Sequence, residues 1–210
     1  MDANIVAYYT ENAEKIGDQY DQADQSGILQ FLRESFDLVR APGARYALDL
    51  GAGQGHYAIR LAEDFNLQVI ALEPVAAMRL AGQQKFPHES IRWVDGAMPS
   101  LPDEITGMNG AFCFAASLAS WHYMDAQDRQ ETLGALALLM PPGSRFCITH
   151  PYPPSREHQF SIPAEETLRQ VRDSKLWTVE RHAVLPYPVK ANATAAKSKA
   201  QILAFDLKRC

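Results

Sequence analysis

Short apolar runs alternate with helix-like segments along most of the chain. Five runs are predicted to be strands because each is short, apolar and bounded by glycine, proline or polar residues: 46–50, 68–72, 91–94, 111–116 and 145–149. Helical spacing of apolar residues predicts helices over 56–64, 75–86, 125–140 and 161–174. Two more strands are expected over 177–185 and 201–207. Repeated strand–helix units indicate an α/β fold with a mostly parallel sheet.

The N-terminal part differs from this alternation. The first forty residues are polar and helix-like, and apolar residues recur at helical spacing over 26–39, with Ser26 as the expected N-cap. Pro42 and Gly43 then end the helix. We therefore expect a helical segment over residues 1–42 and an α/β domain over 43–210.

Composition and charge narrow the class of protein. The 210 residues suit one domain, and 47% hydrophobic with 21% charged residues is ordinary for a soluble globular chain. The formal charge of −5 argues against a nucleic-acid partner, and no run approaches the roughly 20 apolar residues of a membrane span. The start of the chain lacks a signal peptide, and the three cysteines (Cys113, Cys147 and Cys210) lie far apart. These features favour a cytoplasmic protein with reduced thiols.

Three alternating glycines follow the first predicted strand in the sequence ALDLGAGQG, residues 47–55. Glycine allows positive φ and lets the backbone approach a ligand closely, and the next helix directs its N-terminal amides into the same space. Asp49 lies at the tip of the strand, where its carboxylate can meet an ammonium group. The pattern indicates a cofactor-binding turn.

Two further acids end later strands. Glu73 closes the second predicted strand, where a carboxylate can accept both hydroxyls of a ribose. Asp95 closes the third, and Gly96 and Ala97 after it suit the edge of an adenine. A nicotinamide dinucleotide is the main competitor, but its G-x-G-x-x-G fingerprint requires glycine where His56 stands. S-adenosylmethionine (SAM) is therefore the predicted cofactor.

Over residues 45 to about 150 the chain resembles a class I SAM-dependent methyltransferase of the small-molecule type. The resemblance rests on LDLGAGQG, VIALEP, VDGAMPSLP, AFCFAASLASWHYM and LLMPPGSRFCITHP in that order. It implies a Rossmann-like seven-stranded sheet of order 3-2-1-4-5-7-6 with the last strand antiparallel. It also implies that residues 1–42 form an N-terminal helical lid over a SAM-binding catalytic domain of residues 43–210. A lid tyrosine would close over SAM, and Ala115 or Ala116 would supply a carbonyl to the methionine amine. The expected cofactor-binding residues are Tyr8, Tyr20, Asp49, Gly51, Ala52, Gly53, Gly55, Glu73, Pro74, Met78, Asp95, Gly96, Ala97, Ala115 and Ala116.

The sulfonium methyl group is already activated, so the protein mainly has to align the acceptor and exclude water. A base helps when the acceptor is a hydroxyl or an acidic N–H, and histidine suits neutral pH. His122 and His150 follow predicted strands and are the candidates, although His122 could equally orient its own loop. Candidates for binding the acceptor are Trp121, Tyr123, Tyr152 and Arg156, each with packing or solvation as the alternative. No metal site is predicted.

Three functions stay open. The leading one is methyl transfer to O, N or S of a small-molecule acceptor by a monomer or homodimer. The first alternative is a SAM-consuming cyclase or lyase that gives azetidine-2-carboxylate and methylthioadenosine. The second is a non-catalytic SAM-binding protein. Ala116-Ser117-Leu118 stands where enzymes that methylate nucleic-acid bases carry Asp-Pro-Pro-Tyr or Asn-Pro-Pro-Tyr, which weighs against a nucleic-acid substrate.

Overall fold

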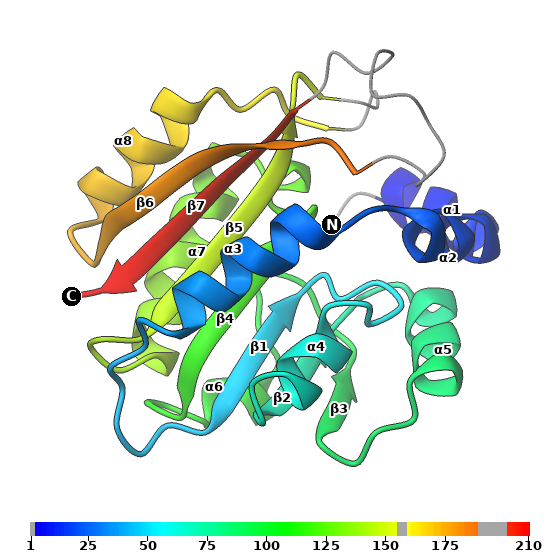
Figure 1. Ribbon diagram of the computed structural model, residues 1–210, viewed down its shortest axis with the longest axis horizontal. Coiled ribbons are helices and arrows are strands. Elements are labelled where there is room, and N and C mark those ends of the chain that lie inside the picture. The colour runs from blue at the N-terminus through cyan, green and yellow to red at the C-terminus, as the bar shows by residue number, and fades with distance from the viewer. Residues whose placement is uncertain (1–2, 155–158, 189–200) are drawn as a thin grey trace.

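Seven strands form one mixed sheet in the order β3-β2-β1-β4-β5-β7-β6 (Figure 1). The computed structural model describes residues 3–154, 159–188 and 201–210. The strands are β1 (Tyr46–Leu50), β2 (Gln68–Leu72), β3 (Ile91–Val94), β4 (Phe112–Leu118), β5 (Arg145–Tyr152), β6 (Trp177–Pro186) and β7 (Gln201–Arg209). The strand β7 runs antiparallel to both β5 and β6, and the other pairings are parallel. The predicted fold class and strand order are confirmed.

Helices cover both faces of the sheet (Figure 1). Their bounds are α1 (Ala3–Glu11), α2 (Ala13–Gln22), α3 (Ser26–Phe36), α4 (Ala58–Glu63), α5 (Ala76–Lys85), α6 (Asp103–Thr106), α7 (Ala126–Leu139), α8 (Ala164–Ser174) and the 3₁₀ turn η1 (Trp121–Tyr123). Apolar residues of α3 and α4 pack on one face, and those of α6, α7 and α8 pack on the other. The short α6 and η1 are too small for apolar spacing to predict.

The central strands are mostly apolar because both of their faces are covered. All seven residues of β4 are buried. In β1, Leu48 packs among residues of the α7 side, whereas its neighbour Ala47 packs among residues of the α3 side. This alternation of one residue is the period of a strand, and it fixes which side chains reach each layer.

The starts of α7 and α8 differ in how well the predicted N-caps describe them. The side chain of Asp125 accepts a hydrogen bond of 2.8 Å from the amide of Asp128, so the predicted cap of α7 is confirmed. The helix α8 begins at Ala164 and not at Ser161. Pro163 disfavours helical backbone at the residue before it, which delays the start.

The third helix also starts one residue earlier than a cap at Ser26 would allow. Ser26 is the first residue of α3 and Gln25 is its N-cap, while the carboxylate of Asp24 accepts a 3.0 Å hydrogen bond from the amide of Ser26. The helix ends at Phe36, three residues before the predicted end at Val39. The helix α3 packs on the sheet, whereas α1 and α2 contact α5 at the carboxyl edge of the sheet. Only α1 and α2 therefore have the position expected of a lid.

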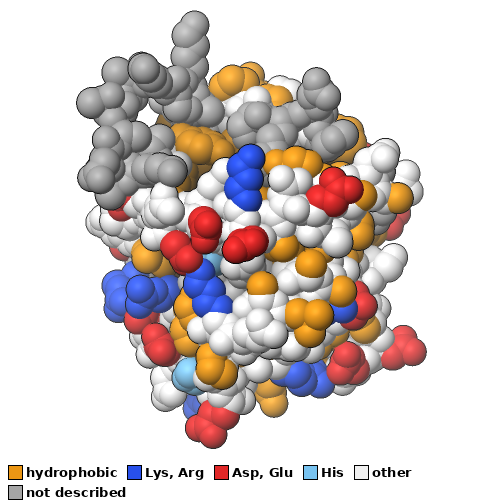
Figure 2. Space-filling view, turned by 90° about the vertical axis from the view of Figure 1, so that its right-hand side faces the viewer, with side chains coloured by type: hydrophobic (Ala, Val, Ile, Leu, Met, Phe, Trp, Pro, Cys, Tyr) orange, Lys and Arg blue, Asp and Glu red, His pale blue; other side chains and the backbone are white. Residues whose placement is uncertain are grey.

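The outer surface carries charges of both signs. Figure 2 shows acidic and basic side chains interspersed among apolar ones on the face that carries α5. Across the described ranges, no helix combines the length and the apolar character that crossing a membrane requires.

Candidate active site

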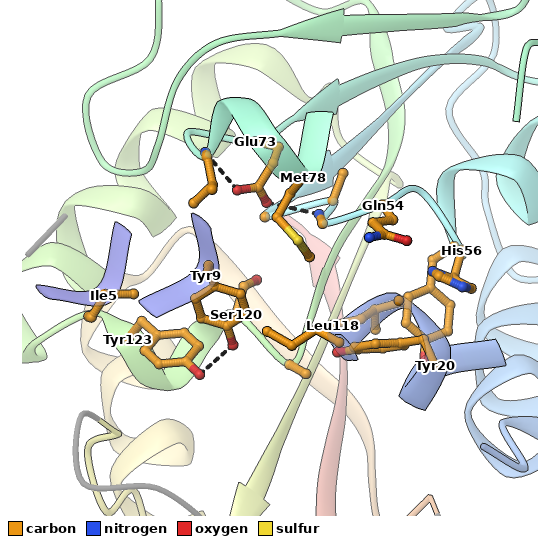
Figure 3. A pocket seen from close by; sticks show the side chains of 18 residues that line it. Ile5, Tyr9, Tyr20, Gln54, His56, Glu73, Met78, Leu118, Ser120 and Tyr123 are labelled. Atoms are coloured by element: carbon orange, nitrogen blue, oxygen red, sulfur yellow. Dashed lines mark hydrogen bonds between the residues drawn. The ribbon is translucent and has the colours of Figure 1, made fainter. Parts of the chain in front are cut away.

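A cavity lies where β1, β2 and β4 end, and α1 and α2 close it (Figure 3); its empty space is about 670 Å³, part of which is open to solvent. The loop after β1 supplies one wall, and the end of β2 with the start of α5 supplies a second. The segment after β4 forms a third wall. The carboxyl ends of parallel strands are the usual position for a ligand in this kind of sheet.

The glycine loop after β1 requires glycine for its shape. The φ angles are +71° at Gly51, +57° at Gly53 and +83° at Gly55, values that other residues adopt only with strain. The amide of Gly51 donates a 2.8 Å hydrogen bond to the carbonyl of Leu72. A Cβ atom on Gly51 would lie 2.6 Å from the Cβ of Ser120, so a larger residue there would displace the segment after β4.

Glu73 forms the second wall and is 6% exposed. Its two carboxylate oxygens accept hydrogen bonds from the amides of Gly53 (2.8 Å) and Val75 (2.9 Å), and in Figure 3 the side chain faces the cavity. Burial raises the pKa of the Glu73 carboxyl, while the two amides oppose that shift. The carboxylate is thus held rigidly and keeps lone pairs for a ligand that donates hydrogen bonds.

Asp49, at the end of β1, is 1% exposed. Burial and then the nearby charge of Glu73 raise the pKa of Asp49 to about 7, and the amide of Ala58 lowers it. Its Oδ2 atom has no hydrogen-bond partner within the part of the chain that the structure describes. A buried carboxylate oxygen without a partner is costly, and a cationic amine would supply the missing partner.

The lid is bonded directly to the glycine loop. The side-chain amide of Gln54 donates a 2.9 Å hydrogen bond to the carbonyl of Ala13 in α2. The Nε2 atom of His56 lies 2.8 Å from Oδ1 of Asp21, which also pairs with Lys85. Burial lowers the pKa of His56, and the Asp21 carboxylate opposes that shift. Gln54 and His56 therefore attach α2 to the glycine loop.

A second cavity, which we call the acceptor chamber, adjoins the first; its empty space is about 1120 Å³, part of which is open to solvent. Residues that line both cavities are Tyr9, Ile16, Tyr20, Tyr57, Ala119 and Tyr123. The hydroxyl groups of Tyr9 and Tyr123 lie 2.6 Å apart at this shared wall (Figure 3). The amide of Gln159 donates a 3.2 Å hydrogen bond to the Tyr123 hydroxyl. A reaction between ligands in the two cavities would have to occur beside this pair.

Residues 47–143 match the family model described as a methyltransferase domain. This segment is a methyltransferase domain. The match covers the glycine loop, Glu73 and the segment after β4, which are the parts that form the first cavity. No curated protein matches the chain.

Solved structures with this fold include several methyltransferases. Geranyl diphosphate C-methyltransferase from Streptomyces coelicolor A3(2), in complex with Mg²⁺, geranyl diphosphate and S-adenosyl-L-homocysteine, is 15% identical with a TM-score of 0.69, covering 89% of this chain and 79% of that chain. A SAM-dependent methyltransferase from Leishmania major is 14% identical with a TM-score of 0.67, covering 88% and 72%. The [4+2]-cyclase SpnF is 14% identical with a TM-score of 0.67, covering 88% and 82%. At these identities the likeness concerns the fold, and the predicted class I methyltransferase fold is confirmed.

The structure brings part of the predicted cofactor set to the first cavity of the methyltransferase domain. The predicted residues that line it are Tyr20, Gly51, Ala52, Gly53, Glu73 and Met78. Gly55 and Pro74 shape the adjoining turns without lining the cavity. Asp49 lies behind the wall, fully buried.

Other predicted cofactor residues lie elsewhere. Asp95, whose side chain is 71% exposed, pairs with Arg79, and the following Gly96 and Ala97 do not line the cavity. Tyr8 is exposed on α1, and its neighbour Tyr9 lines the cavity instead. The helix turns the two side chains about 100° apart, and packing decides which one faces inward.

The segment after β4 differs from the prediction by about three residues. Ala115 and Ala116 are buried inside β4, which continues to Leu118 because β5 pairs with it up to that residue. Leu118 and Ala119 line the cavity in their place. Ala119 has a φ of +59°, and its amide donates a 3.0 Å hydrogen bond to the carbonyl of Thr149.

The two candidate bases occupy different environments. His122, in η1, is 1% exposed and lines the acceptor chamber. His150 is buried in β5 with its ring stacked on Phe205, 5.9 Å between centroids, and lines neither cavity. Burial lowers the pKa of His150 to about 4. The structure therefore makes His150 a neutral core residue and leaves His122 as the candidate.

Among the predicted acceptor residues, Tyr123 lines both cavities. Trp121 is fully buried and packs edge-on against Phe146, with 5.8 Å between ring centroids. Tyr152 is 38% exposed at the end of β5 and lines neither cavity. Arg156 lies outside the described residues.

Several lining residues were missed by the sequence prediction. Two of them, Tyr9 and Ile16, lie eleven and four residues before the predicted Tyr20, which is the spacing of one helix face, and α1 and α2 present all three to the cavity. That spacing is a signal that could have identified Tyr9. Ser120 and Tyr57 carry no comparable signal, because the path of the chain after β4 and after the glycine loop decides their position.

The described residues include histidine, cysteine, aspartate and glutamate, the side chains that commonly bind metal ions. No group of three or more histidine, cysteine, aspartate or glutamate residues there could hold a metal ion. The absence of a metal cofactor stays a prediction.

Proposed function

We propose that this protein transfers the methyl group of SAM to an oxygen, nitrogen or sulfur atom of a small molecule held in the acceptor chamber. The observation that carries the proposal is the pair of adjoining cavities in a methyltransferase fold, one beside the glycine loop and one beyond the wall that contains Tyr9 and Tyr123. When bound, SAM supplies an activated methyl group on a sulfonium. The protein then has to hold the acceptor in line and keep water out.

The first cavity fits SAM by its chemistry. Gly51 and Gly53 let the backbone approach the ligand, and Glu73 faces the cavity where it can accept hydrogen bonds from ribose hydroxyls. Asp49 has a buried oxygen for the ammonium group. Carbonyl groups of Leu118 and Ala119 replace those expected from the middle of β4. These roles are part of the proposal, as are weaker contributions from Asp95, Gly96 and Ala97 to the adenine.

The acceptor side would supply position and a proton acceptor. Ideal alignment is worth roughly 7–11 kcal/mol of barrier. Aromatic rings near the sulfonium, from Tyr9, Tyr20 or Tyr123, would add about 0.5–2 kcal/mol. His122 borders the chamber and is the residue that we propose to take the proton of a hydroxyl acceptor.

The acceptor chamber favours transfer over cyclisation of SAM. Closing the aminobutyrate chain on itself needs no second substrate, so a chamber of about 1120 Å³ beside the cofactor would have no use. The [4+2]-cyclase SpnF shares the fold, so the fold leaves the reaction open and a product assay has to decide it.

Calorimetry and product analysis test the proposal. We expect SAM and S-adenosylhomocysteine to bind and to raise the Tm of the full chain, whereas Gly51→Val, which cannot keep the loop open, should abolish both effects. S-adenosylhomocysteine formed only with an acceptor-containing cell extract supports methyl transfer. Methylthioadenosine formed from SAM alone supports cyclisation, and turnover of neither kind supports a non-catalytic protein. Failure to bind SAM would overturn the proposal.

We also propose that the protein acts in the cytoplasm as a monomer or homodimer without a nucleic-acid partner, with its lid in the segment 1–42. The formal charge of −5 and the buried, free Cys113 and Cys147 support this. Light scattering after size-exclusion chromatography, with and without added tRNA, tests the oligomeric state and the absence of binding.

A further inference from the structure

The walls of the acceptor chamber contain no charged side chain among the residues that the structure describes. Aromatic and aliphatic residues from α1, α2 and α3 form one side, including Tyr9, Tyr20 and Ile28. The ends of β5 and β7 add Thr149 and Ile202. No lysine, arginine, aspartate or glutamate lines any described part of the chamber.

The adjoining cofactor cavity differs, because the carboxylate of Glu73 is part of its wall. Along the described walls, an anionic acceptor would lose its hydration without meeting a lysine or an arginine, and a protonated amine would meet no carboxylate. Either loss costs several kcal/mol when nothing compensates it. The described walls therefore favour an uncharged acceptor.

Most polar groups on these walls already bond within the protein. The side-chain amide of Gln25 donates to the carbonyl of Tyr20 (2.8 Å), and the hydroxyl oxygen of Thr149 accepts from the amide of Ala119 (3.3 Å). The Tyr9–Tyr123 hydroxyl pair is also bonded, internally and by Gln159, but it lies at the wall that both cavities share. A polar acceptor atom bonded to this pair would be placed next to the cofactor.

The chemistry of the pair selects the acceptor atom. A phenolic hydroxyl both donates and accepts hydrogen bonds, so it matches a neutral hydroxyl group, which does the same. A thiol is a weak partner in both roles, and an aliphatic amine is protonated at neutral pH. Among oxygen, nitrogen and sulfur acceptors, the hydroxyl fits best.

We propose that the acceptor chamber takes a neutral, mostly apolar small molecule whose single hydroxyl the Tyr9–Tyr123 pair orients for O-methylation. The inference rests on the proposed function. The hydroxyl oxygen forms a bond to the methyl carbon while the carbon–sulfur bond breaks, and that electron pair stays on sulfur to give S-adenosylhomocysteine. The hydroxyl proton passes to His122 or to water, and the second product is a neutral methyl ether.

Isosteric probes that differ only in charge test the acceptor class. We would measure the Kd of 6-hydroxy-2-naphthamide, 6-hydroxy-2-naphthoate and 2-naphthol on full-length protein saturated with S-adenosylhomocysteine, and ether formation with SAM by mass spectrometry. The amide and 2-naphthol should bind at least about tenfold more tightly than the carboxylate, and only the neutral probes should give appreciable ether. Equal or tighter binding of the carboxylate overturns the inference, as does failure of both neutral probes to bind.

SAM binding is measured separately by calorimetry without any probe. A protein that binds SAM and prefers the carboxylate contradicts the acceptor class alone. A protein that binds no SAM contradicts the proposed function. The two failures are therefore distinguishable.

One residue at the exposed side of the chamber allows the charge to be changed without touching the core. Gln19, on the exposed side of α2, lines the chamber. Gln19→Lys should narrow the preference for the amide over the carboxylate by about threefold to tenfold, while the uncharged control Gln19→Met should keep it. An unchanged preference in Gln19→Lys would mean that the wall does not set charge selectivity.

The role of the hydroxyl pair has its own variants. Tyr123→Phe and Tyr9→Phe should each lower kcat/KM for 2-naphthol by at least about tenfold, while the Kd of SAM changes less than about threefold. Tyr46→Phe, in a tyrosine at the opposite end of β1, should change neither quantity. A parallel loss of SAM binding and turnover would show that the pair only supports the cofactor cavity, and that result would overturn its orienting role.

Discussion

The two cavities of this protein are built in different ways. The cofactor cavity is shaped by the backbone at the ends of β1 and β2, with Glu73 held by two amides and Asp49 buried behind it. The acceptor chamber is shaped by side chains of three N-terminal helices and of strand ends, and its described walls carry no charge. Backbone geometry therefore shapes the cavity for the cofactor, which related enzymes have in common. Side chains, which are replaced more easily, shape the cavity for the acceptor, which differs between enzymes.

Electrostatics separates the cavities further. Burial raises the pKa of Asp49 to about 7 and also raises that of Glu73, so the folded protein keeps two carboxylates that are costly to ionise. A cationic ligand recovers part of that cost on binding. The described walls of the acceptor chamber carry no carboxylate whose ionisation is costly, so the affinity for an acceptor must come from apolar contact and a few hydrogen bonds.

The largest expected effect compares two histidines. His122→Ala should lower kcat on a hydroxyl acceptor by roughly 10²–10⁴-fold and remove one limb of the pH profile, because a positioned base would be lost. His150→Leu should leave kcat unchanged below the unfolding temperature, because His150 lies in the core away from both cavities. Steady-state kinetics against pH checks both variants. Equal losses in the two variants, or a small pH-independent loss in His122→Ala, would contradict a base at His122.

The next effect compares two acids of the cofactor cavity. Glu73→Gln loses at least one of the hydrogen bonds from the amides of Gly53 and Val75, and it also loses the charge that faces the ligand. A loss of about 2–3 kcal/mol of binding free energy should raise the Kd of SAM roughly 30–100-fold. Asp95→Asn should raise it less than about threefold, because the Asp95 side chain is 71% exposed. Calorimetry at neutral pH distinguishes them, and similar effects would mean that both acids contact the ligand equally.

A smaller effect concerns pH. Because the pKa of Asp49 in the folded protein is raised above its ordinary value of 3.8, ionisation opposes folding, and the free energy of unfolding without ligand should fall as pH rises from about 4 through 7. A SAM ammonium group prefers the ionised form, so affinity should rise roughly 10–30-fold between pH 5.5 and 7.5 and fall again as the ammonium group loses its proton at about pH 8.

Asp49→Asn is the control for this prediction. The variant should bind SAM more weakly, with no rise in affinity over the same pH interval. Proton release on binding, measured by calorimetry in buffers of different ionisation enthalpy, should be present in the wild type below pH 7 and absent in the variant. Proton uptake on binding would reverse the assigned sign.

The smallest effect concerns the lid. Asp21→Asn weakens the partly exposed contacts to His56 and Lys85, and SAM should dissociate about twofold to threefold faster, as surface ion pairs contribute little. Glu104→Gln breaks a similar exposed pair with Arg92 away from both cavities and should leave the rate unchanged. Stopped-flow fluorescence measures both rates. Identical rates in Asp21→Asn and the wild type would mean that this contact does not hold the lid.

Much of the cofactor cavity could be predicted because its signals are local. The turn after β1 needs glycines in a short stretch, and Glu73 follows directly from the end of an apolar run. Ala115 and Ala116 were placed wrongly because the length of β4 depends on its pairing with β5, which no local pattern records. The acceptor side depends even more on neighbours, and only His122 and Tyr123 of its predicted residues line a cavity.

The sequence by itself determined the strands and the glycine loop, because apolar period and turn chemistry act over a few residues. The strand order followed from the resemblance of the motifs to class I methyltransferases. Only the tertiary structure decided that Tyr9 and not Tyr8 faces inward, that His150 is a core residue, and that a chamber whose described walls are uncharged adjoins the cofactor cavity. These features depend on which helix face packs against which strand end. That choice is made by burial over the whole molecule, and neighbouring residues in the sequence do not encode it.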